Sequence, residues 1–352
     1  MKPLILIIIL IAGICFSCRE VYESNVNAEQ NVLVVNGLIT DEARPYIVKL
    51  TMASQYNKND SNLYVSNAHV RILDDEGNIS LLSESYPGVY VTNPAELLGK
   101  PGRSYSLHIE TSDNKVYESA FQLLSPNNFK DTVYAEFSSQ DELVEDNYGG
   151  ISKVTTQGID MLIDINNNTD TLPRFRFQNI VLVESEFTVF LGPTYFCWST
   201  LNPSDLVNIT DDKYQTTLSS IQKHKLGFIP TTYYYNTFDP NNAEVKAYVV
   251  NRILRVDKYC INKETFQFYK NVNMLLSAQG KIFDPIAFNF RGNIICKTNP
   301  QELVLGFFEA SSVKSDFYAV KPGEKNVIKV PSRVLPSSPG KVVNIPPSFW
   351  VY

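Results

Sequence analysis

Short apolar runs separated by turn residues fill the stretch from residue 31 to residue 125. Val32–Val35 is a compact apolar run, while Ile47–Thr51 and Ala68–Ile72 alternate between apolar and polar positions. Alternation with a period of two is typical of strands with one buried face, and the sequence Asp74-Asp75-Glu76-Gly77-Asn78 is typical of a hairpin turn. About seven such strands predict an immunoglobulin-like or transthyretin-like β-sandwich over residues 31–125.

A second, larger unit is expected over residues 129–352, after a boundary at Pro126-Asn127-Asn128. It is also rich in strand patterns. The clearest strands are predicted at Gly158–Asn166, Arg174–Thr188 and Ala247–Asp257. The fold class is therefore mainly β: an amino-terminal sandwich followed by a larger β-rich domain.

One segment of the second unit, residues 262–279, departs from the strand pattern and predicts an amphipathic helix. Asn262 is suited to cap its amino end, and Glu264 carries a negative charge where the helix dipole favours one. Gly280 is suited to end the helix. Apolar residues recur at helical spacing and define its packing face: Phe266, Tyr269, Val272 and Leu276.

The amino terminus has the pattern of an export signal. Leu4–Phe16 is an unbroken apolar run of signal-peptide length, too short to span a membrane comfortably. Ser17 supplies a small residue before Cys18, which is the pattern of lipoprotein processing, with the Cys18 thiol as the lipidated atom. The alternative is an ordinary cleaved signal beside a chance cysteine. The predicted segments are a signal peptide over residues 1–17 and a lipidated tether over residues 18–30.

Charge and composition narrow the classes of partner. The chain has 352 residues, 31 Lys and Arg against 37 Asp and Glu, and a formal net charge of −6. Nucleic acids and anionic lipid headgroups require basic surfaces, so the charge argues against both as partners. Only three histidines are present, and the phosphate-loop, dinucleotide, zinc-protease and serine-hydrolase motifs are missing. No cofactor, metal site or catalytic residue is predicted.

Three cysteines lie beyond Cys18, at Cys197, Cys260 and Cys296. Their spacing does not match the paired ligands of a zinc site. Outside the cytoplasm a disulfide can persist, and an odd number of thiols allows at most one. We expect Cys260 to be a buried free thiol. The expected bridge, if one forms, joins Cys197 to Cys296.

Aromatic side chains supply the candidate binding residues. Consecutive tyrosines in a strand cannot all point inward, so at least one of Tyr233, Tyr234 and Tyr235 is expected to face solvent. Trp350 lies in an aromatic carboxyl-terminal tail. The alternatives are an edge strand with one ordinary exposed tyrosine and, for the tail, core packing.

The remaining polar candidates have structural interpretations. His69 and His108 are expected at half-exposed strand positions, although adjacent strands could also bring them together on a metal. His224, between two lysines, is expected in a solvated turn. The acidic run 141–146 lacks the spaced ligand series of a calcium loop and is expected to be solvated.

An ordered set of motifs resembles one bacterial family. The set comprises Val34–Asp41, Glu264–Tyr269, Gly280–Pro285, Gly292–Ile294 and Val304–Val313. It is similar to the Bacteroidota lipoprotein family catalogued as domain of unknown function 4249. The resemblance implies an outer-membrane lipoprotein, often encoded beside a TonB-dependent receptor, and it implies no catalytic residues. Within the motifs, Gly292 and Gly306 are interpreted as turn or close-approach glycines.

Three functions are compared on these grounds. The first is a non-enzymatic binding protein, anchored by lipid to the outer membrane, facing the cell surface and accessory to a TonB-dependent receptor. The second is a cell-surface hydrolase with a site assembled in space, which a serine placed beside His224 or an acidic pair would favour. The third is a structural or adhesive stalk. The receptor in the first hypothesis rests on the resemblance alone.

Overall fold

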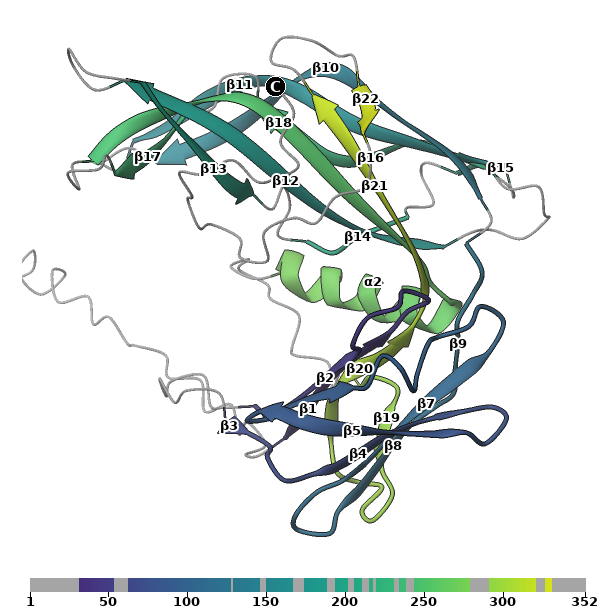
Figure 1. Ribbon diagram of the computed structural model, residues 1–352. Helices are drawn as coiled ribbons and strands as arrows, with labels where there is room; N and C mark the ends of the chain where they lie inside the picture. Colours follow the sequence, from purple (N-terminus) through teal and green to yellow (C-terminus); the bar gives the residue numbers. More distant parts are fainter. Residues whose placement is uncertain are drawn as a thin grey trace, which may run out of the picture.

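The computed structural model describes residues 32–53, 63–127, 129–145, 150–166, 174–188, 194–201, 206–210, 215–217, 220–230, 234–238, 244–278, 291–320 and 327–330. In this part of the chain the protein is mainly β, as predicted, with three sheets and one α-helix. Figure 1 shows one sheet in the lower half of the molecule, two sheets in the upper half, and the helix between them.

The first sheet has eleven strands and follows the order β19-β8-β7-β4-β5-β6-β2-β1-β20, with β3 paired to β2 and β9 to β7. Its end strands β19 and β20 contact each other, so the sheet curls back on itself around one core. The strands are β1 (Leu33–Ile39), β2 (Ile47–Met52), β3 (Leu63–Tyr64), β4 (His69–Asp74), β5 (Ile79–Tyr86), β6 (Val89–Thr92), β7 (Ser104–Glu110), β8 (Val116–Ser119), β9 (Gln122–Leu123), β19 (Ile294–Cys296) and β20 (Val304–Ala310).

Alternation decides which face of the first sheet is buried. On β1, Leu33, Val35 and Ile39 point inward and are fully buried, and Leu107 and Ile109 do the same on β7. The strands predicted over residues 32–35, 47–51 and 68–72 are confirmed as β1, β2 and β4, with shifts of a few residues at their ends.

Two strands of the first sheet come from the carboxyl-terminal part of the sequence, within the range 129–352 that was expected to form the second unit. β20 pairs in parallel with β1, from Leu33 opposite Val304 to Ile39 opposite Ala310. β19 pairs antiparallel with β8. Parallel partners need a long connection between them, and here most of the chain supplies it, which is why local patterns do not reveal this pairing.

Two glycines and an asparagine close the first sheet. A Cβ on Gly292 would lie 1.5 Å from the Gly306 oxygen, and Gly306 itself has φ +91° against the Val35 carbonyl. Only glycine fits such close backbone contacts, as predicted for both positions. Beside them, the Asn293 side chain accepts a hydrogen bond from Phe308 N (2.9 Å) and donates one to Phe308 O (2.8 Å).

The upper half contains a four-stranded sheet in the order β10-β11-β16-β15 and a seven-stranded sheet in the order β13-β12-β18-β21-β22, with β14 paired to β12 and β17 to β18. The strands predicted over residues 158–166, 174–188 and 247–257 are confirmed within β11, β12 and β18. The bounds are β10 (Lys130–Glu145), β11 (Ile151–Asn166), β12 (Phe175–Thr188), β13 (Thr194–Leu201), β14 (Asn208–Ile209), β15 (Gln215–Thr217), β16 (Ser220–Pro230), β17 (Tyr234–Phe238), β18 (Glu244–Cys260), β21 (Ser312–Val320) and β22 (Val327–Val330).

These two sheets enclose a second core. Ile159 and Ile163 of β11 pack in the same cluster as Phe175 and Val183 of β12 and Val256 of β18. The cluster lies at one end of the long strands and does not reach the β10–β11 hairpin tip, where the described side chains are mostly exposed. Among the described side chains, the packed cluster therefore ends before the hairpin tip.

Helix α2 (Lys263–Ala278) confirms the predicted helix over residues 262–279. Asn262 caps it, because its Oδ1 accepts a hydrogen bond from Thr265 N at 2.8 Å. Its packing face differs in part from the prediction: Thr265 is fully buried while Leu276 is exposed. The ring centroids of Phe268 on the helix and Phe307 on β20 lie 4.5 Å apart, so the helix covers the outer face of β20.

The chain passes directly from one body to the other at Ser311. This residue alone separates β20, in the first sheet, from β21, in the third sheet. Figure 1 shows the two strands as one extended path from the lower half of the molecule to the upper half, beside α2. The helix and this path together form the connection between the bodies.

Candidate functional site

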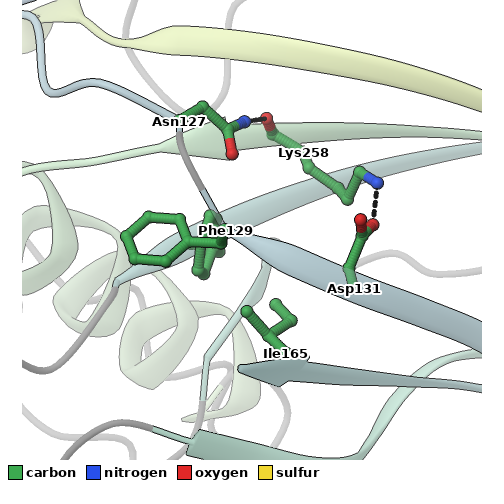
Figure 2. A pocket seen from close by; sticks show the side chains of 6 residues that line it. Asn127, Phe129, Asp131, Ile165 and Lys258 are labelled. Atoms are coloured by element: carbon green, nitrogen blue, oxygen red, sulfur yellow. Dashed lines mark hydrogen bonds and ion pairs between the residues drawn. The ribbon is translucent and has the colours of Figure 1, made fainter. Parts of the chain in front are cut away.

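The pocket shown in Figure 2 lies where β10 begins, between the two upper sheets. It is lined by Asn127, Phe129, Asp131, Ile165, Phe175 and Lys258. The Asn127 amide donates a hydrogen bond to the Lys258 carbonyl at 3.1 Å. The space that a water-sized molecule can occupy is about 10 Å³, which is room for about one water molecule and is far too small for an organic ligand.

A compact charged cluster borders this pocket. The Lys258 ammonium, 3% exposed, forms ion pairs with Asp131 and Asp316, and Lys314 lies 3.3 Å from Asp131. Two cations therefore face two carboxylates; Lys258 and both carboxylates are largely shielded from water, whereas the Lys314 side chain is exposed. Burial together with these carboxylates raises the pKa of the neighbouring Tyr318 above its ordinary range. A buried lysine held between two carboxylates is engaged in ion pairs, so Lys258 serves as a structural cation.

A second buried cluster lies where the two bodies meet, and we call it the junction: Arg176, Tyr259, Tyr269, Glu309 and Ser311. Arg176 of β12 donates to Glu309 of β20 at 2.9 Å. Ser311 Oγ donates to the same carboxylate oxygen at 2.6 Å, and the Tyr269 hydroxyl donates to the other at 2.7 Å. All of the Glu309 carboxylate is thus hydrogen-bonded.

Aromatic rings complete the junction around the guanidinium. Arg176 and Tyr259 are direct cross-strand partners on β12 and β18, which places the Arg176 Cζ atom 3.9 Å from the Tyr259 ring centroid. The ring of Tyr269 lies 5.2 Å from the same atom on the helix side. An arginine over an aromatic face is stabilised by cation–π attraction, more so when water is excluded.

The electrostatics of the junction favour one fixed charge state. Burial lowers the pKa of Arg176, but the Glu309 carboxylate opposes this and the net pKa is raised, so the guanidinium remains charged. Burial, and next the charge of Glu309, raise the pKa of Tyr269 well above its ordinary range. Burial likewise raises the pKa of Tyr259. The junction is consequently a permanently charged connection between β12, β18, α2 and β20, in which every oxygen of Glu309 is hydrogen-bonded while Arg176 Nε is not.

The sequence analysis did not identify either buried cluster. A signal was present, because Arg176 and Glu309 interrupt the strongly apolar runs Phe175–Val183 and Val304–Ala310. Charged residues are almost never fully buried unless they are paired. Pairing them across 133 positions in the sequence, however, requires the fold.

Several predicted site residues lie outside the described part of the chain: Cys18, Tyr233 and Trp350. Tyr234 and Tyr235 belong to β17, where their backbones pair with Tyr248 and Ala247 of β18. The side chains of both tyrosines are outside what the structure describes, and their expected role in binding stays a prediction.

The structure corrects the disulfide prediction. Cys296 is a free, buried thiol on β19 of the first sheet, with its Sγ 3.2 Å from Thr298 Oγ1. Cys197 lies on β13, in the third sheet. The two were assigned to one domain because β19 follows the helix in sequence, whereas it pairs with β8. Cys260 is free and buried, as expected, and burial raises its pKa to about 12.

The three histidines occupy different environments. His69 is exposed on β4, while His108 lies between Arg71 (3.0 Å from Nε2) and Glu118 (3.1 Å from Nδ1). His224 is buried in β16, so the expected solvated turn is wrong. Its Nε2 is 2.7 Å from Asn208 Oδ1, and its ring centroid lies 4.8 Å from that of Phe177. Packing on β12 explains this burial despite the flanking lysines.

The acidic run 141–146 begins in the β10–β11 hairpin. Asp141 forms an ion pair with Lys153 at 2.9 Å and accepts a hydrogen bond from Thr155 at 2.6 Å, and these bonds lower its pKa. Over the described ranges, no group of three His, Cys, Asp or Glu side chains has the proximity needed to hold a metal ion. Within the same ranges, no helix has both the length and the apolar character to cross a membrane.

Comparison with known proteins identifies the family of the chain but no individual relative. The family model described as "Domain of unknown function (DUF4249)" matches residues 19–316, which is most of the chain. Searches of curated proteins and of solved structures gave no match. The match spans both bodies and the junction between them, and the chain therefore belongs to the DUF4249 family.

Proposed function

We propose that this chain is an exported, lipid-anchored outer-membrane protein that works by binding another protein, as an accessory to a TonB-dependent receptor. The apolar run before Ser17-Cys18 supports export and lipidation at Cys18. The acidic balance of the chain favours a protein partner over nucleic acid or a bare anionic membrane. Lipidation would hold the protein at the outer membrane, with its body facing the cell surface.

The observation that carries this proposal is the junction. Arg176 and Glu309 are buried, and both bond or pack against the half-buried Tyr269, so these charged and aromatic groups between the bodies serve to fix the bodies together. A large body joined to a lipid anchor suits presentation of a binding surface. The buried groups are not available to a substrate.

Within this proposal the two bodies have different roles. The first sheet, which the strands before residue 125 form together with β19 and β20, acts as a support beside the lipid anchor. The residues from 129 onward in the upper sheets carry the specific contacts. Because β20 and β21 are separated only by Ser311, the support holds the upper body in a defined orientation.

The test is recovery of the lipidated chain from membranes in mild detergent, followed by identification of stoichiometric partners. We expect a β-barrel receptor to be recovered with the chain. The matched control is Cys18→Ala, which should remain unprocessed or soluble and should recover much less receptor. Isolation of the chain alone from membranes that contain intact receptors would contradict the proposal.

Surface exposure is tested separately by protease treatment of intact cells. A cell-surface chain should be degraded while periplasmic control proteins survive. Protection of the chain would place it on the periplasmic side and would leave the receptor interaction to be judged by the first experiment.

A further inference from the structure

The β10–β11 hairpin continues well beyond the sheet that supports it. β10 and β11 pair without interruption from Lys130 opposite Asn166 to Glu145 opposite Ile151. The third strand, β16, ends its pairing with β11 at Gly158 opposite Pro230. Residues 138–145 and 151–157 consequently form a two-stranded segment, which we call the ribbon. A two-stranded hairpin by itself is only marginally stable in water.

The ribbon exposes large apolar side chains on both faces. Register places Leu143 and Ile151 on the same face as the buried Ile159, and these two side chains are 75% and 72% exposed. Val144 and Val154 are exposed on the opposite face. The apolar face of β11 therefore continues past the end of the core, where the described residues do not cover it. Such surface is typical of an interaction site.

The charges of the ribbon are predominantly acidic. Asp141 is neutralised by Lys153. In the part of the chain that the structure describes, Glu142 and Glu145 form no ion pair; register places Glu142 opposite Val154 and Glu145 opposite Ile151. Each face thus combines a large apolar side chain with one uncompensated carboxylate.

Among the described residues, the outer edge of β10 has no hydrogen-bonded strand, since its neighbour in the sheet is β11 on the other side. The first half of β10 lies against the third sheet: Asp131 contacts Lys258 and Lys314, and β22 lies close to β10 as well. The second half of β10 belongs to the ribbon. An exposed edge presents unpaired backbone N–H and C=O groups that can bind an added strand.

We infer that the ribbon is a docking edge for an extended segment of a partner protein in which two adjacent apolar residues are flanked by basic ones, the pattern that complements Glu142-Leu143-Val144-Glu145. The segment adds as a strand to β10 in the region of residues 137–145. Its apolar side chains cover Leu143 and Val144, and its basic side chains lie near Glu142 and Glu145. This inference rests on the proposed function only in that the chain acts by contacting another protein.

Charge favours this occupant over two others. A second copy of the chain, paired edge to edge through β10, would bring Glu142 and Glu145 of both copies into one small region, and like charges across strands are destabilising. An anionic lipid surface would be repelled by the same carboxylates. A basic strand is attracted by them and gains backbone hydrogen bonds as well.

The experiment uses the full chain in detergent solution and two end-capped synthetic peptides, one built on the pattern lysine-valine-valine-lysine and the other on glutamate-valine-valine-glutamate. We expect the lysine peptide to bind at least about tenfold more tightly at low salt, and the difference to shrink as salt is raised. The double variant Glu142→Gln, Glu145→Gln should lose most of this preference. Glu96→Gln, an exposed acidic position on the first body, is the matched control and should retain it.

Backbone hydrogen exchange supplies the second readout. Strand addition should slow exchange of amides in residues 137–145 when the lysine peptide is bound, with no change in β4, an interior strand of the first sheet. Equal affinity for the two peptides, or lysine-peptide binding without protection of β10, would overturn the inference. So would a dimer of the chain alone that Leu143→Asp dissociates, because a second copy would then occupy the ribbon.

The outcomes separate this inference from the proposed function. Receptor recovery from membranes combined with a negative peptide result leaves the function in place and moves the contact away from β10. A positive peptide result without receptor recovery preserves the docking edge and removes the receptor proposal.

Discussion

The junction and the ribbon contain similar kinds of residue in opposite surroundings. At the junction, the carboxylate of Glu309 is buried and its oxygens are bonded to Arg176, Tyr269 and Ser311. On the ribbon, Glu142 and Glu145 are exposed beside apolar side chains. Charged and apolar groups therefore stabilise the fold in one region and remain available for contacts in the other.

This difference shows how burial distinguishes structural residues from candidate binding residues. A buried ion pair has lost its water, so removal of one partner leaves a charge with neither solvent nor counter-ion. An exposed glutamate keeps its hydration and contributes little to stability. Substitutions at the junction should therefore lower the free energy of unfolding much more than substitutions on the ribbon.

Removal of the Glu309 carboxylate should produce the largest loss of stability. Glu309→Ala leaves the Arg176 charge buried and unpaired, and we expect the free energy of unfolding to fall by about 3–5 kcal/mol. The matched control is Glu136→Ala, which removes an exposed partner of Lys223 and should cost less than about 1 kcal/mol. Chemical denaturation of both variants provides the measurement. Equal losses of stability in the two variants would show that the junction contributes no more to stability than a surface ion pair.

The closure of the first sheet is tested at two glycines with positive φ. Gly306→Ala places a Cβ 1.9 Å from the Val35 carbonyl, so it should disrupt the pairing of β1 with β20 and cost more than about 3 kcal/mol. Gly77 has a similar φ of +86° but open space around it, so Gly77→Ala should cost only about 1 kcal/mol of backbone strain. Thermal unfolding of both proteins measures the difference. Similar values would mean that β20 can move away from β1 without penalty.

Alkaline pH should weaken the buried region beside the junction. Burial raises the pKa of Cys260 from 9.0 to about 12, so above pH 9 the unfolded chain loses this proton while the folded chain keeps it. The unfolded state then binds fewer protons, and stability falls as pH rises, by up to about 1.4 kcal/mol per pH unit from this thiol. Cys260→Ala should flatten the decline between pH 9 and pH 10. An unchanged slope would assign the alkaline loss to other groups, such as Tyr259 and Tyr269.

The ribbon should show the smallest effect on stability. Leu143 is exposed, so Leu143→Ala should change the free energy of unfolding by less than about 0.5 kcal/mol. Ile159 lies on the same face of the hairpin but inside the second core, and Ile159→Ala should cost about 2–5 kcal/mol. Denaturation of the two variants makes the comparison. A large loss for Leu143→Ala would show that the ribbon is part of the packed fold.

The sequence determined most of the local structure of this protein. A compact apolar run identified β1, alternation identified β2 and β4, and strand patterns identified parts of β11, β12 and β18. Helix α2 was predicted almost to the residue, because a capping side chain such as Asn262 acts on backbone groups only a few positions away. The close-approach role of Gly292 and Gly306 came from a family resemblance, and both glycines do meet backbone atoms directly.

Only the tertiary structure decided which distant segments meet. It placed β19 and β20 in the first sheet, separated Cys197 from Cys296, buried His224 against Phe177, and joined Arg176 to Glu309. It also showed that Leu276, on the apolar face of the predicted helix, is exposed while Thr265 is buried. Periodicity shows which face of a helix or strand is apolar. Which strands pair, and which faces pack together, depends on contacts between residues far apart in the sequence, and a local pattern carries no information about those contacts.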